Sequence, residues 1–79
     1  MTSVTELESC FVETFALAPG ADPRGLEFQS ILEWDPVGHV RLVGAIESAF
    51  GVMLGTQDML DLNSFARAVE ILNRHGARL

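Results

Sequence analysis

Residues 35–51, DPVGHVRLVGAIESAFG, constrain the fold most, because they carry both a start and a stop signal for a helix. Asp35 is a strong N-cap, since its carboxylate can accept the free N–H groups of a first helical turn. Pro36 suits the first helical position, where the N–H that proline lacks would have no partner. Gly51 is typical of a helix C-terminus. The run therefore predicts a helix that begins at Pro36 and ends before Gly51.

Apolar residues recur along this helix every three or four positions, the pattern of an α-helix with one buried face. The predicted buried stripe is Val37, Val40, Val43, Ile46 and Phe50. The predicted outward positions are Gly38, His39, Arg41, Gly44, Glu47 and Ser48. With one arginine and one glutamate, the outward face is nearly neutral.

Three further helical segments are predicted, and no strand pattern competes with them. The segment PGADPRG ends a first helix with two prolines and two glycines. A long connection over residues 19–34 follows, then the helix from Pro36, a short third helix over residues 57–60, and a fourth that Ser64 caps and Gly76 closes. The residues expected to face the core are Val4, Leu7, Phe11, Phe15 and Ala18 in the first helix, and Phe65, Ala68, Val69 and Leu72 in the fourth. In the connection, Leu26, Phe28, Ile31 and Leu32 are expected to lie against the bundle.

The predicted class is all-α: a small four-helix bundle with a long first loop and a short third helix, in a single domain over residues 1–79. An apolar fraction of 48% in 79 residues is ample for a core, although the chain is near the lower size limit for an independent fold. No apolar run approaches a membrane span, the N-terminus lacks the pattern of a signal peptide, and Cys10 is a lone cysteine. These features favour a cytoplasmic protein.

The net charge of −6, without any lysine, argues against nucleic acid and anionic membranes as partners, because both would repel an acidic chain. Long-range attraction would instead favour proteins with basic patches. An equally simple interpretation is that the charge keeps a small domain soluble. A monomer is the default expectation.

The layout and the segment WDPVGHVRLVGAIESAFGV resemble the acyl carrier protein family, over about Val4 to Leu72. In that family a serine follows the aspartate at the start of the second helix and carries a 4′-phosphopantetheine arm. The resemblance implies the same bundle and the same use of the helix N-terminus, which suits a phosphodiester. It also implies acyl-transferring, ligase or synthase-type enzymes of fatty acid or polyketide biosynthesis as partners.

The motif in this chain is Asp35-Pro36-Val37, so the attachment residue is replaced. Proline has no side-chain oxygen, and no cofactor is expected on this sequence; 4′-phosphopantetheine is expected only if serine occupies position 36. Family members usually present acidic residues on the second helix, whereas this outward face is nearly neutral. GHVRLV resembles some discrete carrier proteins of specialised biosynthesis, which implies different partners. The candidate partner-binding residues are His39, Val40, Arg41, Gly44 and Glu47.

Other reactive side chains have simpler interpretations. Cys10 is predicted to be an apolar filler, since nothing basic lies near it to activate a thiol. His75 falls in a last helical turn, where histidine commonly interacts favourably with the negative end of the helix dipole. Neither histidine has ligand-spaced partners, so no metal site is predicted. Ser64 is assigned to capping, and Ser30 lacks the aspartate of the attachment motif. Trp34 is assigned to anchoring the long connection, with cover for an acyl chain as the alternative.

Three functions are therefore open from the sequence. The favoured one is a binding module with a carrier fold and no arm. The second is a working carrier protein whose natural residue at position 36 is serine. The third, a small enzyme or metal protein on a helical bundle, is disfavoured because no nucleophile, base and orienting group come together.

Overall fold

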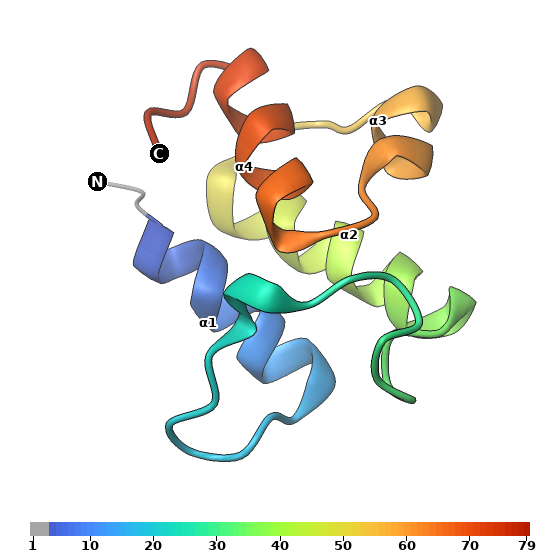
Figure 1. The fold of residues 1–79 in the computed structure, drawn as a ribbon. Coiled ribbons are helices and arrows are strands. Elements are labelled where there is room, and N and C mark those ends of the chain that lie inside the picture. Colours follow the sequence, from blue (N-terminus) through green and yellow to red (C-terminus); the bar gives the residue numbers. More distant parts are fainter. Residues whose placement is uncertain (1–3) are drawn as a thin grey trace.

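The structure, a computed structural model, describes residues 4–79, and these contain four α-helices and one 3₁₀ helix (Figure 1). The elements in chain order are α1 (Val4–Phe15), η1 (Pro23–Gly25), α2 (Pro36–Phe50), α3 (Thr56–Asp61) and α4 (Phe65–Arg74). Within residues 4–79 there is no strand, only an isolated antiparallel bridge between Glu27 and Ser64. The predicted all-α class and small helical bundle are confirmed.

The helix ends follow the capping signals in the sequence. The Asp35 carboxylate accepts a hydrogen bond from Gly38 N–H at 2.7 Å, with Pro36 in the first helical position. Gly51 closes α2 with a φ of 65°, which is in the left-handed region that glycine adopts at low cost. The Ser64 hydroxyl accepts from Arg67 N–H at 3.0 Å at the start of α4. These predicted caps are therefore confirmed.

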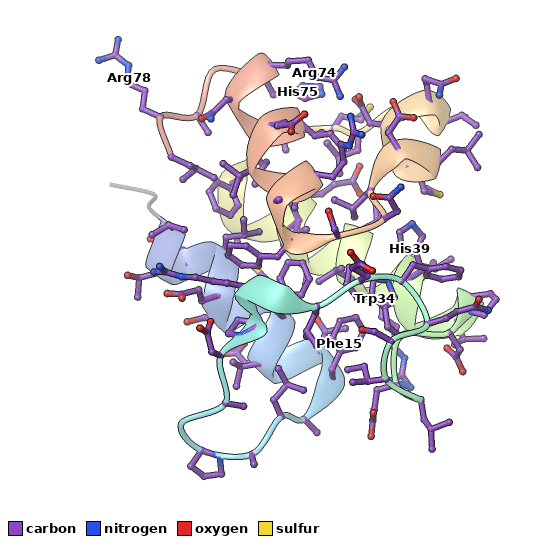
Figure 2. The ribbon with its side chains drawn as sticks, viewed as in Figure 1. Phe15, Trp34, His39, Arg74, His75 and Arg78 are labelled. Carbon is purple, nitrogen blue, oxygen red and sulfur yellow. The ribbon has the colours of Figure 1, made fainter. Side chains whose placement is uncertain are left out.

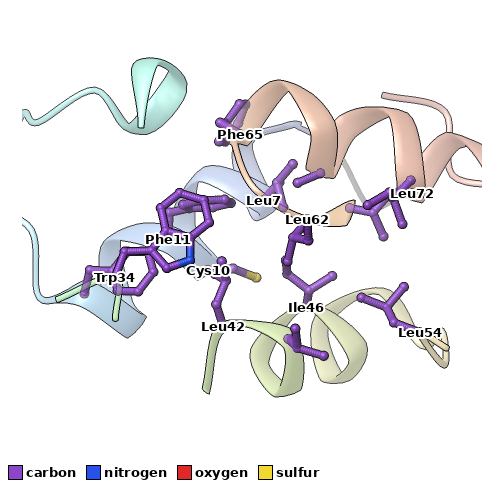
Figure 3. Close-up of a cluster of buried hydrophobic side chains, with 14 residues drawn as sticks. Leu7, Cys10, Phe11, Trp34, Leu42, Ile46, Leu54, Leu62, Phe65 and Leu72 are labelled. Atoms are coloured by element: carbon purple, nitrogen blue, oxygen red, sulfur yellow. The ribbon is translucent and has the colours of Figure 1, made fainter. Parts of the chain in front are cut away.

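A continuous core fills the space between α1, α2 and α4 (Figure 3). Aromatic rings occupy one end of it, near Trp34 and Phe11, and leucine side chains occupy the other, near Leu54 and Leu72. Its members are Leu7, Cys10, Phe11, Phe15, Trp34, Leu42, Val43, Ile46, Leu54, Leu62, Phe65, Ala68, Ile71 and Leu72.

Trp34 anchors the long connection to this core, as predicted. Its side chain is fully buried, with ring centroids 5.4 Å from Phe11 and 5.3 Å from Phe15. Two backbone hydrogen bonds also tie the connection to the start of α4: Phe28 N–H to Asn63 C=O at 2.8 Å, and Phe65 N–H to Leu26 C=O at 3.1 Å. The connection is thus held firmly against the bundle and fixes the direction in which α2 begins.

The predicted buried stripe of α2 is wrong in its first two members. Val37 and Val40 are 66% and 60% exposed, and the helix buries Leu42, Val43 and Ile46 instead. The error arises because α2 is apolar on more than one side, so that the helical period alone does not select the buried side. The packing of the connection against the first turn selects it.

Four smaller corrections concern the other elements. Ala18 is exposed, because α1 ends at Phe15 and Ala16 adopts a positive φ of 50° that turns the chain away. In α4, Ile71 is buried and Val69, which was predicted to face the core, is only half-buried. The core contacts the side of the helix that carries Ile71. Leu32 is 92% exposed, at the outer side of the loop that inserts Trp34. The third helix is one residue longer at each end than predicted.

Candidate functional site

The candidate site is the head of α2, where the family motif would place its attachment serine. Asp35 and Pro36 are both exposed, with Asp35 capping the helix and Pro36 forming its first residue. The Pro36 ring supplies the fixed φ that a helix start needs, but it offers neither a hydroxyl nor an N–H. The head of α2 is therefore a well-formed helix N-terminus without a group that can be esterified.

Gly38 holds the connection close to this helix start. A Cβ atom at Gly38 would overlap the carbonyl oxygen of Glu33 and lie 3.3 Å from Oδ1 of Asp35. The backbone before the helix therefore folds directly over its first turn. Gly38 is buried, not outward-facing as predicted, because the Glu33 carbonyl occupies the place where a side chain would project.

The exposed side of α2 carries Val37, Val40, Arg41 and Gly44, and we call these four residues the α2 face. They recur at three- and four-residue spacing, so they lie along one side of the helix. Three of the predicted partner-binding residues, Val40, Arg41 and Gly44, belong to this surface. Its chemistry is apolar with one positive charge.

Glu47, predicted to face outward, is half-buried and makes an internal hydrogen bond. Its carboxylate accepts a hydrogen bond from Leu54 N–H at 2.9 Å, in the segment that follows Gly51. The side chain thus holds the turn between α2 and α3. This use leaves the α2 face without a free carboxylate.

His39, also predicted to point outward, is half-buried between two neighbours (Figure 2). Its Nδ1 accepts a hydrogen bond from the indole N–H of Trp34 at 3.0 Å, and its Nε2 lies 2.8 Å from the backbone oxygen of Met59. The two rings are nearly parallel, with 17° between their planes and 6.3 Å between their centroids. The correction has a physical reason: the buried indole needs a hydrogen-bond acceptor, and His39 supplies it.

A small apolar cavity of about 200 Å³ lies beside this histidine, between α2, α3 and the connection. Its lining residues are Phe28, His39, Met59, Leu60, Leu62 and Asn63. The neighbouring Leu60 side chain is 71% exposed. The cavity lies on the side of α2 that carries His39, and the core residue Leu62 forms part of its lining.

The remaining reactive side chains do not form a second site. Cys10 is buried, and burial, followed by the nearby Glu13, raises the pKa of its thiol, which therefore stays protonated near neutral pH. The hydroxyl of Ser30 is bonded to the backbone of Glu27, and Ser64 caps α4. Neither serine is a free attachment point in this structure.

His75 lies beyond α4 and pairs with a carboxylate, in addition to its place at the helix end. Its Nε2 lies 2.7 Å from Oδ2 of Asp58 in α3, and this contact lowers the pKa of the Asp58 carboxyl. Among residues 4–79, no three His, Cys, Asp or Glu side chains are grouped so as to hold a metal ion. The same described part of the chain contains no helix of the length and apolar character needed to cross a membrane.

Sequence reasoning missed the exposure of the apolar residues near the site. Leu32 and Leu60 are exposed, as is Val37, and each belongs to an apolar pattern that would normally indicate burial. The available signal was an excess: α2 has more apolar positions than one buried stripe can use. Comparison of the chain with protein families, with curated proteins and with solved structures gives no match in any of the three.

Proposed function

We propose that this chain is an acyl-carrier-protein-like module without an attachment serine, which acts through contacts with biosynthetic enzymes of the fatty acid or polyketide type. The observation that carries the proposal is the head of α2, a fully capped and exposed helix start at which Pro36 replaces the attachment residue. In this proposal the module binds and positions its partners and catalyses no reaction itself.

The arrangement of helices supports the comparison with carrier proteins. A long connection precedes α2, a short α3 follows it, and the aspartate of the motif caps the helix as a carrier's aspartate would be placed to do. The resemblance in sequence and the order and lengths of the helices thus agree. Both direct attention to α2 as the recognition surface.

The chemistry of the α2 face indicates the kind of partner. Its exposed valines favour an apolar groove, and a row of basic residues would find no matching carboxylates there. The overall charge of −6 would still attract a partner with a positive surface at long range. We therefore propose partners that are basic around the docking site and apolar within it.

A second candidate is a working carrier of acyl thioesters on 4′-phosphopantetheine, which applies if serine is the natural residue at position 36. The intact surroundings of Pro36 favour keeping this candidate: Asp35 caps the helix, and position 36 is open to an enzyme. A hydroxyl introduced there would stand at a helix N-terminus, which favours a phosphodiester.

The first experiment incubates Pro36→Ser with coenzyme A and a broad-specificity phosphopantetheinyl transferase, and measures intact mass. The matched control is Pro36→Ala, which lacks the hydroxyl. Addition of phosphopantetheine to the serine variant alone is expected if the surface is carrier-like. Failure of a folded serine variant to react would contradict the carrier-like surface for this transferase.

The second experiment tests binding without the arm. The unmodified chain is added as a competitor while the same transferase modifies an authentic carrier protein. Val40→Asp is expected to weaken competition about tenfold, the loss expected for one buried valine contact, and Ala66→Asp on α4 is the control. Absence of competition by the parent chain, or an equal loss in both variants, would argue against docking through the α2 face.

A further inference from the structure

Helix α3 is contacted by two histidines, one on each side. None of its residues is fully buried, although Leu54 before it and Leu62 after it belong to the core. His39 meets the Met59 backbone oxygen on one side, and His75 meets the Asp58 carboxylate on the other. Two contacts of this short helix are therefore made by imidazole rings, whose hydrogen-bonding roles depend on which ring nitrogen carries a proton.

The contacts of His39 require one particular protonation state. The indole N–H of Trp34 can only donate, so Nδ1 of His39 must carry a lone pair. The Met59 carbonyl oxygen can only accept, so Nε2 must carry the proton. Both hydrogen bonds form together only when the imidazole is neutral, with its hydrogen on Nε2.

The contact of His75 responds to protons in the opposite sense. A proton on His75 adds charge attraction to its 2.7 Å contact with Asp58, whose carboxyl has a lowered pKa chiefly because of this bond. Arg74 adds a longer ion pair to the same carboxylate at 3.8 Å. Protonation of His75 therefore strengthens the attachment of α3 to the end of α4. Protonation of His39 instead removes the acceptor that its hydrogen bond with Trp34 requires.

We propose that His39 is a proton-controlled contact that holds α3 in place beside the apolar cavity. Uptake of a solvent proton at Nδ1 turns the acceptor of the Trp34 indole into a second donor, and the two N–H groups then face each other. Because Trp34 is fully buried, its indole N–H has no water nearby to replace the lost acceptor. The imidazolium must move out toward solvent, and this movement withdraws the hydrogen bond to Met59.

The groups around His39 do not provide a ready substitute partner. Both hydrogen-bond partners of the ring are uncharged, and the ring of Phe28 faces it edge-on at 5.5 Å. The charged side chains on the segments that meet the ring are Glu27, Glu33 and Asp35 in the connection, Arg41 in α2, and Asp58 and Asp61 in α3. Among the described residues none of them forms an ion pair with His39, and Asp35, Asp58 and Asp61 are bonded to Gly38, His75 and Gln57.

The consequence is a change in access to the cavity beside His39. His39 and Met59 both line that cavity, so separating them widens it on the side of α3. The inference does not depend on the proposed function, because the attachment of α3 can be measured on the isolated chain without a partner.

The test uses Trp34, the only tryptophan of a chain without tyrosine, as a fluorescent reporter. Its emission is recorded from about pH 8 down to about pH 4, a wide range because protonation of His39 has to break two hydrogen bonds. The parent chain is expected to show a transition toward a more polar environment. His39→Asn keeps a hydrogen-bond acceptor near the indole at every pH, so this variant is expected to lose the fluorescence transition. His75→Gln is expected to keep the transition.

Amide exchange gives a second measurement on the same samples. Met59 and Leu62 donate backbone hydrogen bonds to Gly55 and Asp58. If one proton controls the opening of these bonds, the equilibrium constant for opening is expected to rise by up to about tenfold for each unit by which the pH falls. A flat titration of the parent chain, a transition that survives in His39→Asn, or one that disappears in His75→Gln would overturn the proposal.

A measurement without any variant keeps the proposal testable if His39→Asn does not fold. Nitrogen-15 spectra of the histidine rings in the parent chain report which ring nitrogen carries the hydrogen. At about pH 8 the proposal requires His39 to be the tautomer with its hydrogen on Nε2. A hydrogen on Nδ1 instead would overturn it.

Discussion

Two glycines of α2 should respond in opposite ways to the same substitution. Gly44 is exposed and has nothing within 4 Å of the Cβ position, whereas a Cβ at Gly38 would overlap the carbonyl oxygen of Glu33. At Gly44, alanine should stabilise the protein by about 0.5–1 kcal/mol, because glycine has more conformational freedom to lose in a helix. The pair therefore separates helix propensity from local packing.

At Gly38 the same propensity gain is outweighed by the clash. Making room for the methyl group requires residues 33–35 to move, since the obstructing atom is backbone. Overpacking of this kind costs about 1–3 kcal/mol, and disturbance of the Asp35 cap adds up to about 1 kcal/mol. After the propensity gain is subtracted, Gly38→Ala should be less stable than the parent chain by about 2 kcal/mol, the middle of a range of roughly 0 to 3.5 kcal/mol.

Urea unfolding followed by far-ultraviolet circular dichroism measures both free energies of unfolding. In thermal unfolding, the melting temperature of Gly44→Ala should be higher than that of the parent chain and the melting temperature of Gly38→Ala lower. Each kcal/mol should correspond to a shift of about 4–8 °C. If Gly38→Ala were as stable as Gly44→Ala, the connection would not lie against the first turn of α2 as described. The description of the candidate site would then have to change with it.

Three further predictions concern single side chains. Asp35→Ala should lower the free energy of unfolding by about 1 kcal/mol through loss of the cap on Gly38; an unchanged urea midpoint would show that the carboxylate does not cap α2. Cys10 should react slowly with iodoacetamide in the folded protein and quickly in denaturant, because burial raises the pKa of its thiol; equal rates would contradict the burial. The lowered pKa of Asp58 means that its contact with His75 stabilises the fold above the ordinary value of 3.8 and is lost as the pH falls through the lower folded value. The free energy of unfolding of Asp58→Asn should therefore fall less in that acid range than the free energy of unfolding of the parent chain. Identical acid unfolding of the variant and the parent chain would argue against the contact.

The helix ends could be predicted from the sequence because each depends on a few neighbouring residues. Asp35, Gly51 and Ser64 act through atoms within one turn of their own position, so their residue types are sufficient. The class of the fold follows from the same local signals together with the helical period. None of this required knowledge of which elements meet in space.

The buried side of α2 and the role of His39 could not be predicted in the same way. Valine at positions 37 and 40 satisfies the helical period as well as the residues that are buried, and only the path of the connection decides between them. The acceptor for the Trp34 indole is likewise settled by where the ring enters the core. These features depend on contacts between elements, and the candidate site is built from them.

The ties between the connection and the start of α4 also bear on how the protein is made. Phe28 bonds to Asn63 and Phe65 bonds to Leu26, which joins positions nearly half the chain length apart. Contacts between such distant positions form late, since the intervening segment must be ordered first. A chain that has been synthesised only as far as α3 therefore lacks the residues that hold the connection at Leu26 and Phe28. We expect the head of α2 to take its final position only after Asn63 and Phe65 have been synthesised.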